Sequence, residues 1–254
     1  GPAASPETLV RLAHRGEELG FDIITIPDHV VIPRDIASRY PYSEDGAFAG
    51  KDPGECLEQL TVAAFLAAST TKLRILTSIM VLPHRHPVLA AKTLATIDFL
   101  SGGRLTVGVG AGWMKEEFEA LGAPPFEHRG TVSAEYLEAF KEMWTNDTPN
   151  YSGTYARISD VTFMPQPVQK PHPPIWVGGE SPPALRRAGQ HGDAWYPIGN
   201  NPQFPMDTTE RLAKAMAAVR EHADRAGRDP AGMDFAYSAG WYDERRAQHF
   251  PDGQ

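Results

Sequence analysis

A histidine that follows a predicted strand is the clearest candidate for proton chemistry in this sequence. His29 comes directly after Asp28, close behind the apolar run Phe21–Ile26. An imidazole titrates near neutral pH, so it can give a proton to a reacting group or take one from it. Asp28 can orient the imidazole ring, or it can cap a turn. We therefore predict an acid or base role for His29, and the alternative is a loop histidine bonded to backbone.

The second chemical feature is a glycine-rich turn suited to an anion. Gly178, Gly179, Glu180 and Ser181 separate a predicted strand from a predicted helix that begins at Pro182. Backbone N–H groups and the positive end of a helix attract phosphate, and glycines let the anion approach closely. Ser181 can also be the N-cap of the helix, as in an ordinary turn. We predict a phosphate site here, with the Glu180 side chain directed away from the anion.

A third feature is the segment Gly108–Trp113, which has glycine at every second position after another predicted strand. This spacing differs from the Gly-x-Gly-x-x-Gly of a dinucleotide-binding fingerprint, so a Rossmann site has little support. Gly110 and Gly112 would instead let the backbone approach a flat ring, with Trp113 beside it. The alternative for Trp113 is a core position at a loop.

Other polar residues have simpler interpretations. We interpret Glu116 and Glu117 as a solvent-exposed helix start, because carboxylates favour that end of a helix. His84 and His86 are two positions apart with proline on both sides, and no carboxylate or thiolate at helical spacing completes a set of ligands. We predict no metal site. Arg104 follows a helix-ending turn and is predicted to be structural.

Alternating helices and strands supply the frame for these residues. Helical spacing of apolar residues predicts helices over 6–20, 57–69, 87–100, 182–190 and 208–226. Short, β-branched runs predict six strands, over 21–26, 73–80, 105–109, 175–177, 193–196 and 233–237. We expect the first strand to be buried on both faces, as in a parallel sheet. Such alternation is typical of parallel strands joined by right-handed crossovers.

This order predicts a (β/α)8 TIM barrel that fills residues 1–254 as one domain. Because six strands are two fewer than a closed barrel has, we expect the first strand and the final helix and strand to be missing from the sequence. Loop insertions are predicted near 33–54, with the composition of a lid, and near 150–174, with a hairpin of 155–158 and 161–163. The candidate residues above follow strand ends, where barrel enzymes have their active sites.

Composition narrows the class of protein. The chain is 41% hydrophobic and 22% charged, which is typical of a globular protein. Its net charge of −8 opposes binding to nucleic acids and anionic membrane surfaces. Neither a membrane span nor a signal peptide is evident, and we expect a cytoplasmic protein. No nucleophile elbow or Walker loop supports a hydrolase or a kinase.

Five segments together resemble the luciferase-like monooxygenase superfamily: 21–29, 82–87, 98–105, 108–113 and 174–179. The resemblance implies that His29 faces the ring of a flavin or deazaflavin. It also implies a bulge at Thr77 and Ser78, commonly with a cis peptide, where Ser78 and Ile79 support the cofactor. The alternative is that these polar residues bond locally within a buried strand. A homodimer and a small-molecule substrate are further implications.

The segment Gly110–Trp113 and the acidic residues after it most resemble the branch that uses coenzyme F420. We therefore predict an oxidoreductase that transfers hydride between F420 and an unknown small organic substrate, with His29 and Asp28 as catalytic residues. One alternative is an FMN-dependent monooxygenase, and another is a non-catalytic protein that binds a flavin. The predicted cofactor contacts are Thr77, Ser78, Ile79, Gly110, Gly112, Trp113, Gly178, Gly179, Glu180 and Ser181.

Overall fold

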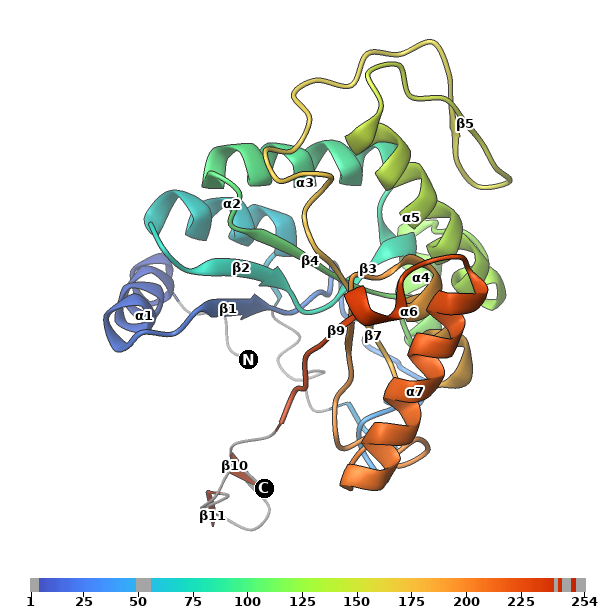
Figure 1. The fold of residues 1–254 in the computed structure, drawn as a ribbon. Coiled ribbons are helices and arrows are strands. Elements are labelled where there is room, and N and C mark those ends of the chain that lie inside the picture. The colour runs from blue at the N-terminus through green and yellow to red at the C-terminus, as the bar shows by residue number, and fades with distance from the viewer. Residues whose placement is uncertain (1–4, 49–55, 240–241, 244–247, 250–254) are drawn as a thin grey trace.

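In the described part of the chain, six parallel strands in a row form the central sheet, as the sequence predicts (Figure 1). The computed structural model describes residues 5–48, 56–239, 242–243 and 248–249. Their order in the sheet is β1, β2, β4, β7, β8, β9, which is the chain order of a (β/α)8 fold. The strands are β1 (Ile23–Ile26), β2 (Arg74–Thr77), β4 (Leu105–Gly110), β7 (Ile175–Gly178), β8 (Ala194–Tyr196) and β9 (Asp234–Phe235).

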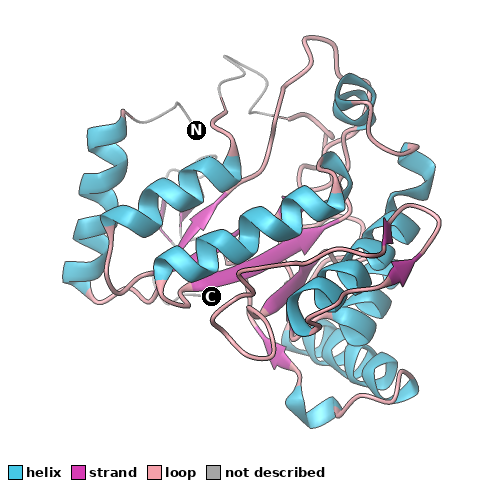
Figure 2. Ribbon diagram, turned by 90° about the horizontal axis from the view of Figure 1, so that it is seen from above, coloured by secondary structure: helices cyan, strands magenta, loops and turns pink. Residues whose placement is uncertain are grey.

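The helices follow one another around the outside of the sheet in the same order. Each packs against the next along the chain, from α1 and α2 through α3 and α5 to α6 and α7. Figure 1 shows α2 and α3 above β2 and β4, and the view from above in Figure 2 shows helices lying over the strands. The five predicted helices are present, and α5 is an addition. The long helices are α1 (Pro6–Leu19), α2 (Gln59–Ser69), α3 (Pro87–Ser101), α5 (Arg129–Thr145), α6 (Pro182–His191) and α7 (Thr209–Arg225).

The short elements lie in the loops. The helical ones are η2 (Leu82–His84), α4 (Lys115–Leu121), η3 (Phe126–His128) and η4 (Pro230–Gly232). The strands are β3 (Met80–Val81), β5 (Tyr151–Ser152), β6 (Arg157–Ile158), β10 (Tyr242–Asp243) and β11 (Gln248–His249). None of the helices in the described part of the chain combines the length and the hydropathy needed to cross a bilayer.

Burial differs between the middle and the edge of the sheet. Every residue of β4 is buried, as expected for a central strand covered on both faces. The same expectation is wrong for β1, where Thr25 is exposed and Ile26 alone is buried. The reason is position: within the described residues β1 pairs only with β2 and lies at the edge of the sheet.

Two predicted elements need correction. The strand predicted over 73–80 is interrupted after β2, and the chain resumes as β3, which pairs with β4. The Ser78–Ile79 peptide bond between them is cis, as the family resemblance implies. The hairpin predicted from 155–158 and 161–163 is wrong, because β6 pairs with β5. The carboxylate of Glu135 accepts N–H groups of the turn between β5 and β6, which favours this pairing.

Arg104 ties together the segments at the opposite end of the sheet from His29. Its guanidinium donates to Ala67 O at 2.7 Å and Thr70 O at 3.0 Å, at the end of α2. It also donates to Ser101 O at 2.8 Å, at the end of α3, and to Leu73 O at 2.9 Å. The predicted structural role of Arg104 is confirmed.

Candidate active site

His29 forms a close pair with a buried glutamate from a distant segment. The His29 Nδ1 atom lies 2.8 Å from Oε2 of Glu117 in α4. The Glu117 side chain is 1% exposed, so the interpretation of this residue as part of a solvated helix start is wrong. Its other oxygen, Oε1, accepts the N–H groups of Val30 at 2.7 Å and Val31 at 3.3 Å. These bonds fold the chain just before the predicted lid loop (residues 33–54) over Glu117 and bury its carboxylate.

The hydrogen bonds keep the Glu117 carboxylate ionised. Burial alone would raise the pKa of Glu117, but the hydrogen bond with His29 and the neighbouring imidazoles hold the pKa below its usual range. The second of these imidazoles is His84, whose Nδ1 lies 3.8 Å from Glu117 Oε1. Neither ring nitrogen of His84 has a hydrogen-bond partner within the described part of the chain, and burial lowers the pKa of His84. Among the described residues no group of acidic, histidine or cysteine side chains is arranged to hold a metal ion.

Asp28 has a different partner from the one the sequence suggests. Its two oxygens each accept a bond of 2.8 Å from the Arg85 guanidinium, and Oδ2 also accepts the Val81 N–H at 2.8 Å. The Arg85 guanidinium also donates a hydrogen bond of 2.6 Å to the carboxylate of Glu58, the N-cap of α2. The carboxylate that holds His29 is therefore Glu117, and Asp28 anchors β1 to the segment after β3.

Aromatic side chains form a wall beside His29. The His29 ring lies 5.0 Å from the ring of Phe48 and 6.3 Å from that of Trp113. Trp113 contacts Tyr40 and Phe48, each with ring centroids 5.2 Å apart. Tyr40 and Phe48 come from the predicted lid loop, of which residues 49–54 lie outside the described residues. Trp113 therefore belongs to the same aromatic cluster as His29. The sequence analysis did not predict that Tyr40 and Phe48 join this cluster.

The glycines at the strand ends make room for side chains of the protein itself. A β-carbon at Gly110 would lie 2.9 Å from Ile79 Cδ1, and one at Gly178 would lie 2.4 Å from it. Gly112 has φ +85° and leaves space for Val81 and Phe118. Ile79 is half-buried at this mouth of the sheet. The glycines thus seat an apolar side chain, whereas the sequence suggested a direct approach to a flat ring.

Of the two polar residues at the end of β2, only Ser78 is placed to face the mouth. Thr77 is fully buried and its hydroxyl donates to Gly108 O at 2.8 Å, so it bonds locally within the sheet. Ser78 is half-buried, and its Oγ lies 3.4 Å from the hydroxyl of Tyr196 at the end of β8. The local alternative therefore describes Thr77.

The turn before α6 offers fewer helix N–H groups than the sequence suggests. Ser181 is the N-cap without a side-chain capping bond, and prolines fill the first positions of the helix. Proline has no N–H, and the Ala184 N–H donates to Ser181 O at 2.8 Å. The Glu180 N–H bonds to its own carboxylate, which leaves the N–H groups of Gly179 and Ser181 as the candidate donors of this turn. Gly179 has φ +97°, a conformation that disfavours any side chain.

Glu180 anchors the loop after β8. Its carboxylate accepts the Ile198 N–H and the Asn201 amide, each at 2.8 Å. Burial raises the pKa of Glu180 above its usual value. The carboxylate is occupied by this loop, in keeping with a side chain directed away from an anion.

A buried arginine near this turn was missed by the sequence analysis. Arg187 in α6 is 7% exposed, and its Nε atom has no hydrogen-bond partner among the residues that the structure describes. Burial, and after it the positive charges of Arg186 and Arg129, lower the pKa of Arg187 to about 10. Its Nη2 atom lies against the start of α5 at Gly130. The neighbouring Arg186 is exposed, so helical periodicity could have indicated that one of the two arginines points inward.

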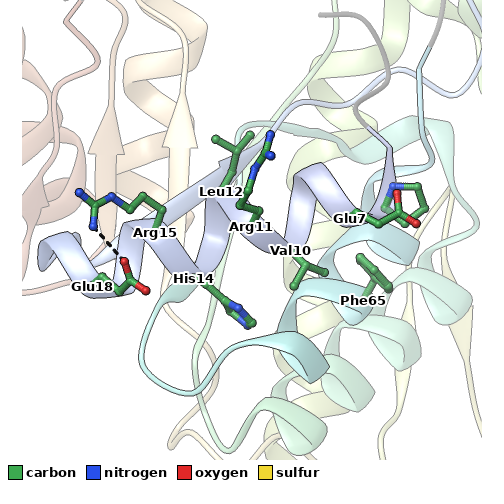
Figure 3. Close-up of a pocket in the computed structure, with 9 residues that line it drawn as sticks. Glu7, Val10, Arg11, Leu12, His14, Arg15, Glu18 and Phe65 are labelled. Carbon is green, nitrogen blue, oxygen red and sulfur yellow. Dashed lines mark hydrogen bonds and ion pairs between the residues drawn. The ribbon is translucent and has the colours of Figure 1, made fainter.

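A groove of about 840 Å³ lies away from these residues, along α1 (Figure 3). Its side chains come from α1 except for Phe65 of α2, and most of them are exposed. It lacks the buried titratable groups of the His29 site, which we regard as the site of chemistry. The lining residues are Pro6, Glu7, Val10, Arg11, Leu12, His14, Arg15, Glu18 and Phe65.

Comparison with known proteins identifies the family. The model of the luciferase-like monooxygenase family matches residues 1–246. The chain belongs to this family. A luciferase-like relative, an FMNH2-dependent dimethylsulfone monooxygenase from Pseudomonas putida, is 37% identical over 190 residues. That match covers 74% of this chain and 52% of the relative, so the chain spans about half the length of that protein.

Solved structures of luciferase-like proteins share the fold. Monooxygenase RslO1 from Streptomyces bottropensis superimposes with a TM-score of 0.72 at 28% identity, over 95% of this chain and 68% of that one. An F420-dependent secondary alcohol dehydrogenase superimposes with a TM-score of 0.72 at 24% identity, over 92% of this chain and 64% of that one. A monooxygenase and an F420-dependent dehydrogenase therefore share this fold.

Proposed function

We propose that this luciferase-like protein is an oxidoreductase that uses a reduced flavin at the C-terminal ends of its strands. The observation that carries the proposal is His29, held by a buried glutamate 2.8 Å away and walled by aromatic side chains. For the cofactor we propose FMN, and for the reaction the oxygenation of a small organic substrate. The relative at 37% identity, named as an FMNH2-dependent monooxygenase, supports this choice.

Hydride transfer with coenzyme F420 is the second candidate. It is favoured by the segment Gly110–Trp113, which resembles that branch of the family. The two candidates use the same cofactor site, since the ring systems have similar shapes. They differ in whether molecular oxygen takes part.

The residues at the strand ends fit a flavin-type group. Arg187 and Arg129 supply positive charge, and Arg187 makes no ion pair among the described residues. Ser181, at the start of α6, lies about 9 Å along the helix axis from Arg187, given the rise of a helix. A phosphate at this turn would be attracted by the positive end of α6 and by this charge. Ile79, seated against Gly110 and Gly178, offers an apolar surface for a ring.

The chain's own residues would control protons and water. A bound reduced flavin supplies the electrons of the reaction. Because Nδ1 of His29 is bonded to Glu117, Nε2 is the nitrogen left to accept or return a proton at the substrate or ring. Trp113 and Phe48 lie beside the His29 ring, and together with Tyr40 they would limit the access of water to it.

A binding titration tests the proposal. The protein is titrated with FMN and, separately, with F420, each oxidised and reduced, and fluorescence is followed. Binding of reduced FMN, followed by oxygen consumption with a substrate panel, is the expected result. Tight binding of F420 alone would favour the second candidate, and binding without turnover would favour a non-catalytic flavin protein. Failure of both cofactors to bind would overturn the proposal.

A further inference from the structure

We propose that Glu117 is a positioning residue that sets the tautomer of His29. In this assignment Glu117 keeps the proton of the neutral imidazole on Nδ1, so that Nε2 is an acceptor. The catalytic consequence rests on the proposed function of His29, whereas the assignment of the tautomer rests on the geometry alone.

The hydrogen bonds of Glu117 determine which atom holds the proton. An ionised carboxylate accepts hydrogen bonds and cannot donate them. Oε1 already accepts the N–H groups of Val30 and Val31, and Oε2 is 2.8 Å from His29 Nδ1. The only bond that an ionised Oε2 can make with this nitrogen is one in which Nδ1–H donates. A neutral ring that donates from Nδ1 has an unprotonated Nε2.

Neighbouring groups allow Glu117 to remain ionised in its buried position. Asp28 also lies close, but Arg85 pairs with it through two bonds of 2.8 Å. The His84 imidazole lies 3.8 Å from Oε1 and attracts the carboxylate only when it is protonated, a form that burial disfavours. Among the described residues the Cys56 thiol also lies near the carboxylate. Hydrogen bonds from two backbone N–H groups and one imidazole balance the single negative charge.

Glu116, the residue before Glu117 on α4, also accepts backbone N–H groups of the loop after β1, but it has no contact with the imidazole. Glu116 Oε1 accepts the N–H groups of Ala37 at 2.8 Å and Ser38 at 3.0 Å. Lys115 N donates back to Ser38 Oγ at 3.1 Å. The start of α4 therefore holds residues 30–38 at both ends, and Glu117 alone reaches the imidazole. Glu116 provides a matched control.

Glu117→Gln separates positioning from folding. The glutamine carbonyl can still accept the Val30 and Val31 N–H groups, but its amide donates to Nδ1 and so moves the imidazole proton to Nε2. The tautomer is read from the ¹⁵N shifts of His29 at about pH 8.5, where an ordinary imidazole is neutral. We expect Nδ1–H in the parent protein and Nε2–H in Glu117→Gln. Turnover should fall by about 10²- to 10⁴-fold with KM little changed.

Glu116→Gln removes the same charge from the same helix and should leave the His29 tautomer unchanged and turnover within about twofold of the parent. An Nε2–H tautomer in the parent protein would overturn the proposal whether or not Glu117→Gln folds. So would an unchanged tautomer in folded Glu117→Gln. If the tautomer changes as expected but His29→Ala has full turnover, the assignment of Glu117 stands and the proposed role of His29 is wrong.

Discussion

The His29 imidazole is held by a carboxylate 88 positions further along the chain. The two side chains meet because β1 ends, and α4 begins, at the same end of the sheet. The aromatic wall, from the lid loop and from Trp113, closes the same place. A single residue substitution at His29 therefore tests the site directly.

His29→Ala should lower turnover by about 10²- to 10⁴-fold, because it removes a positioned proton-transfer group. Loss of its hydrogen bond to Glu117 should cost roughly 1 kcal/mol of unfolding free energy. Single-turnover kinetics and thermal unfolding on the same preparation measure both effects. His14→Ala, which removes an exposed histidine from α1, is the control. A destabilised variant with the full rate would reject the catalytic role.

At Gly179 a pair of substitutions isolates charge from strain. Gly179→Ala and Gly179→Asp both place a side chain at φ +97° and should lose similar stability, roughly 1–2 kcal/mol. The aspartate also brings a negative charge to the proposed phosphate site, so it should bind FMN at least about tenfold more weakly than the alanine variant. Calorimetric titration of both variants measures the difference. Equal affinities would remove residues 179–181 from the site.

Some residues of the site could be identified from the sequence and others could not. The position of His29 at the mouth of the sheet could be predicted because the residue closely follows a β-branched run, and its catalytic role stays a prediction. Glu117 was not, because an acidic residue at a helix start usually faces water. Its burial depends on residues 30–38 folding over α4, which no local pattern reveals. Thr77 was predicted to contact the cofactor, with local bonding as the alternative, because a buried hydroxyl and a ligand-facing hydroxyl look the same in the sequence. Its hydroxyl bonds locally.

Among the elements, α1 is joined to the chain before β2 by one carboxylate. Glu17 Oε1 accepts the N–H groups of Thr71 at 2.8 Å and Leu73 at 3.0 Å, and that of Lys72 between them. These backbone hydrogen bonds, those of Leu73 and Lys72 first, lower the pKa of Glu17 to about 2. Since the folded state favours the ionised form, its contribution to stability is present above the ordinary pKa of about 4.3.

That contribution should disappear as the pH falls from about 4.3 toward the folded pKa of about 2. Glu17→Gln should therefore be less stable than the parent at pH 7, and the difference should shrink through this window. Urea unfolding at several pH values measures it. Glu18→Gln removes a neighbouring exposed carboxylate whose partner is Arg15, and should behave like the parent. A constant difference at all pH values would contradict the assignment.

The helices and strands were predicted more completely than the pairing of the strands. Strands were found because β-branched runs alternate with helical spacing. α5 was not predicted, because its buried side includes polar residues such as Ser133 and Tyr136 that obscure the apolar periodicity. The hairpin at β5 and β6 was assigned to the wrong partner because Glu135, from that unpredicted helix, holds its turn.

At the scale of the whole molecule, α2 and α3 present apolar side chains outward as well as inward. Leu89 and Leu100 on α3 are 65% and 68% exposed, and Phe99 and Phe65 are also exposed. Leu89 and Leu100 lie about three turns apart on one face of the helix. An outward apolar surface of this kind is typical of an interface.

We therefore predict that the protein forms a homodimer through this face. Leu89→Lys combined with Leu100→Lys should shift the dimer toward monomer, because charged side chains are costly at the centre of an interface. Light scattering after gel filtration measures the mass. Leu12→Lys, at an exposed leucine of α1, is the control and should leave the mass unchanged. A monomeric parent protein would refute the prediction.

The Arg104 side chain has a consequence for how the molecule opens. Its guanidinium faces the carbonyl ends of both α2 and α3, where the two helix dipoles place partial negative charge. Terminal turns normally fray independently, and their amides exchange with solvent quickly. Here the last turns of both helices share one cation, so fraying of either removes a partner from the other. The amide protons of these two turns should exchange together, as one cooperative unit, while the lid at the other end of the sheet exchanges on its own.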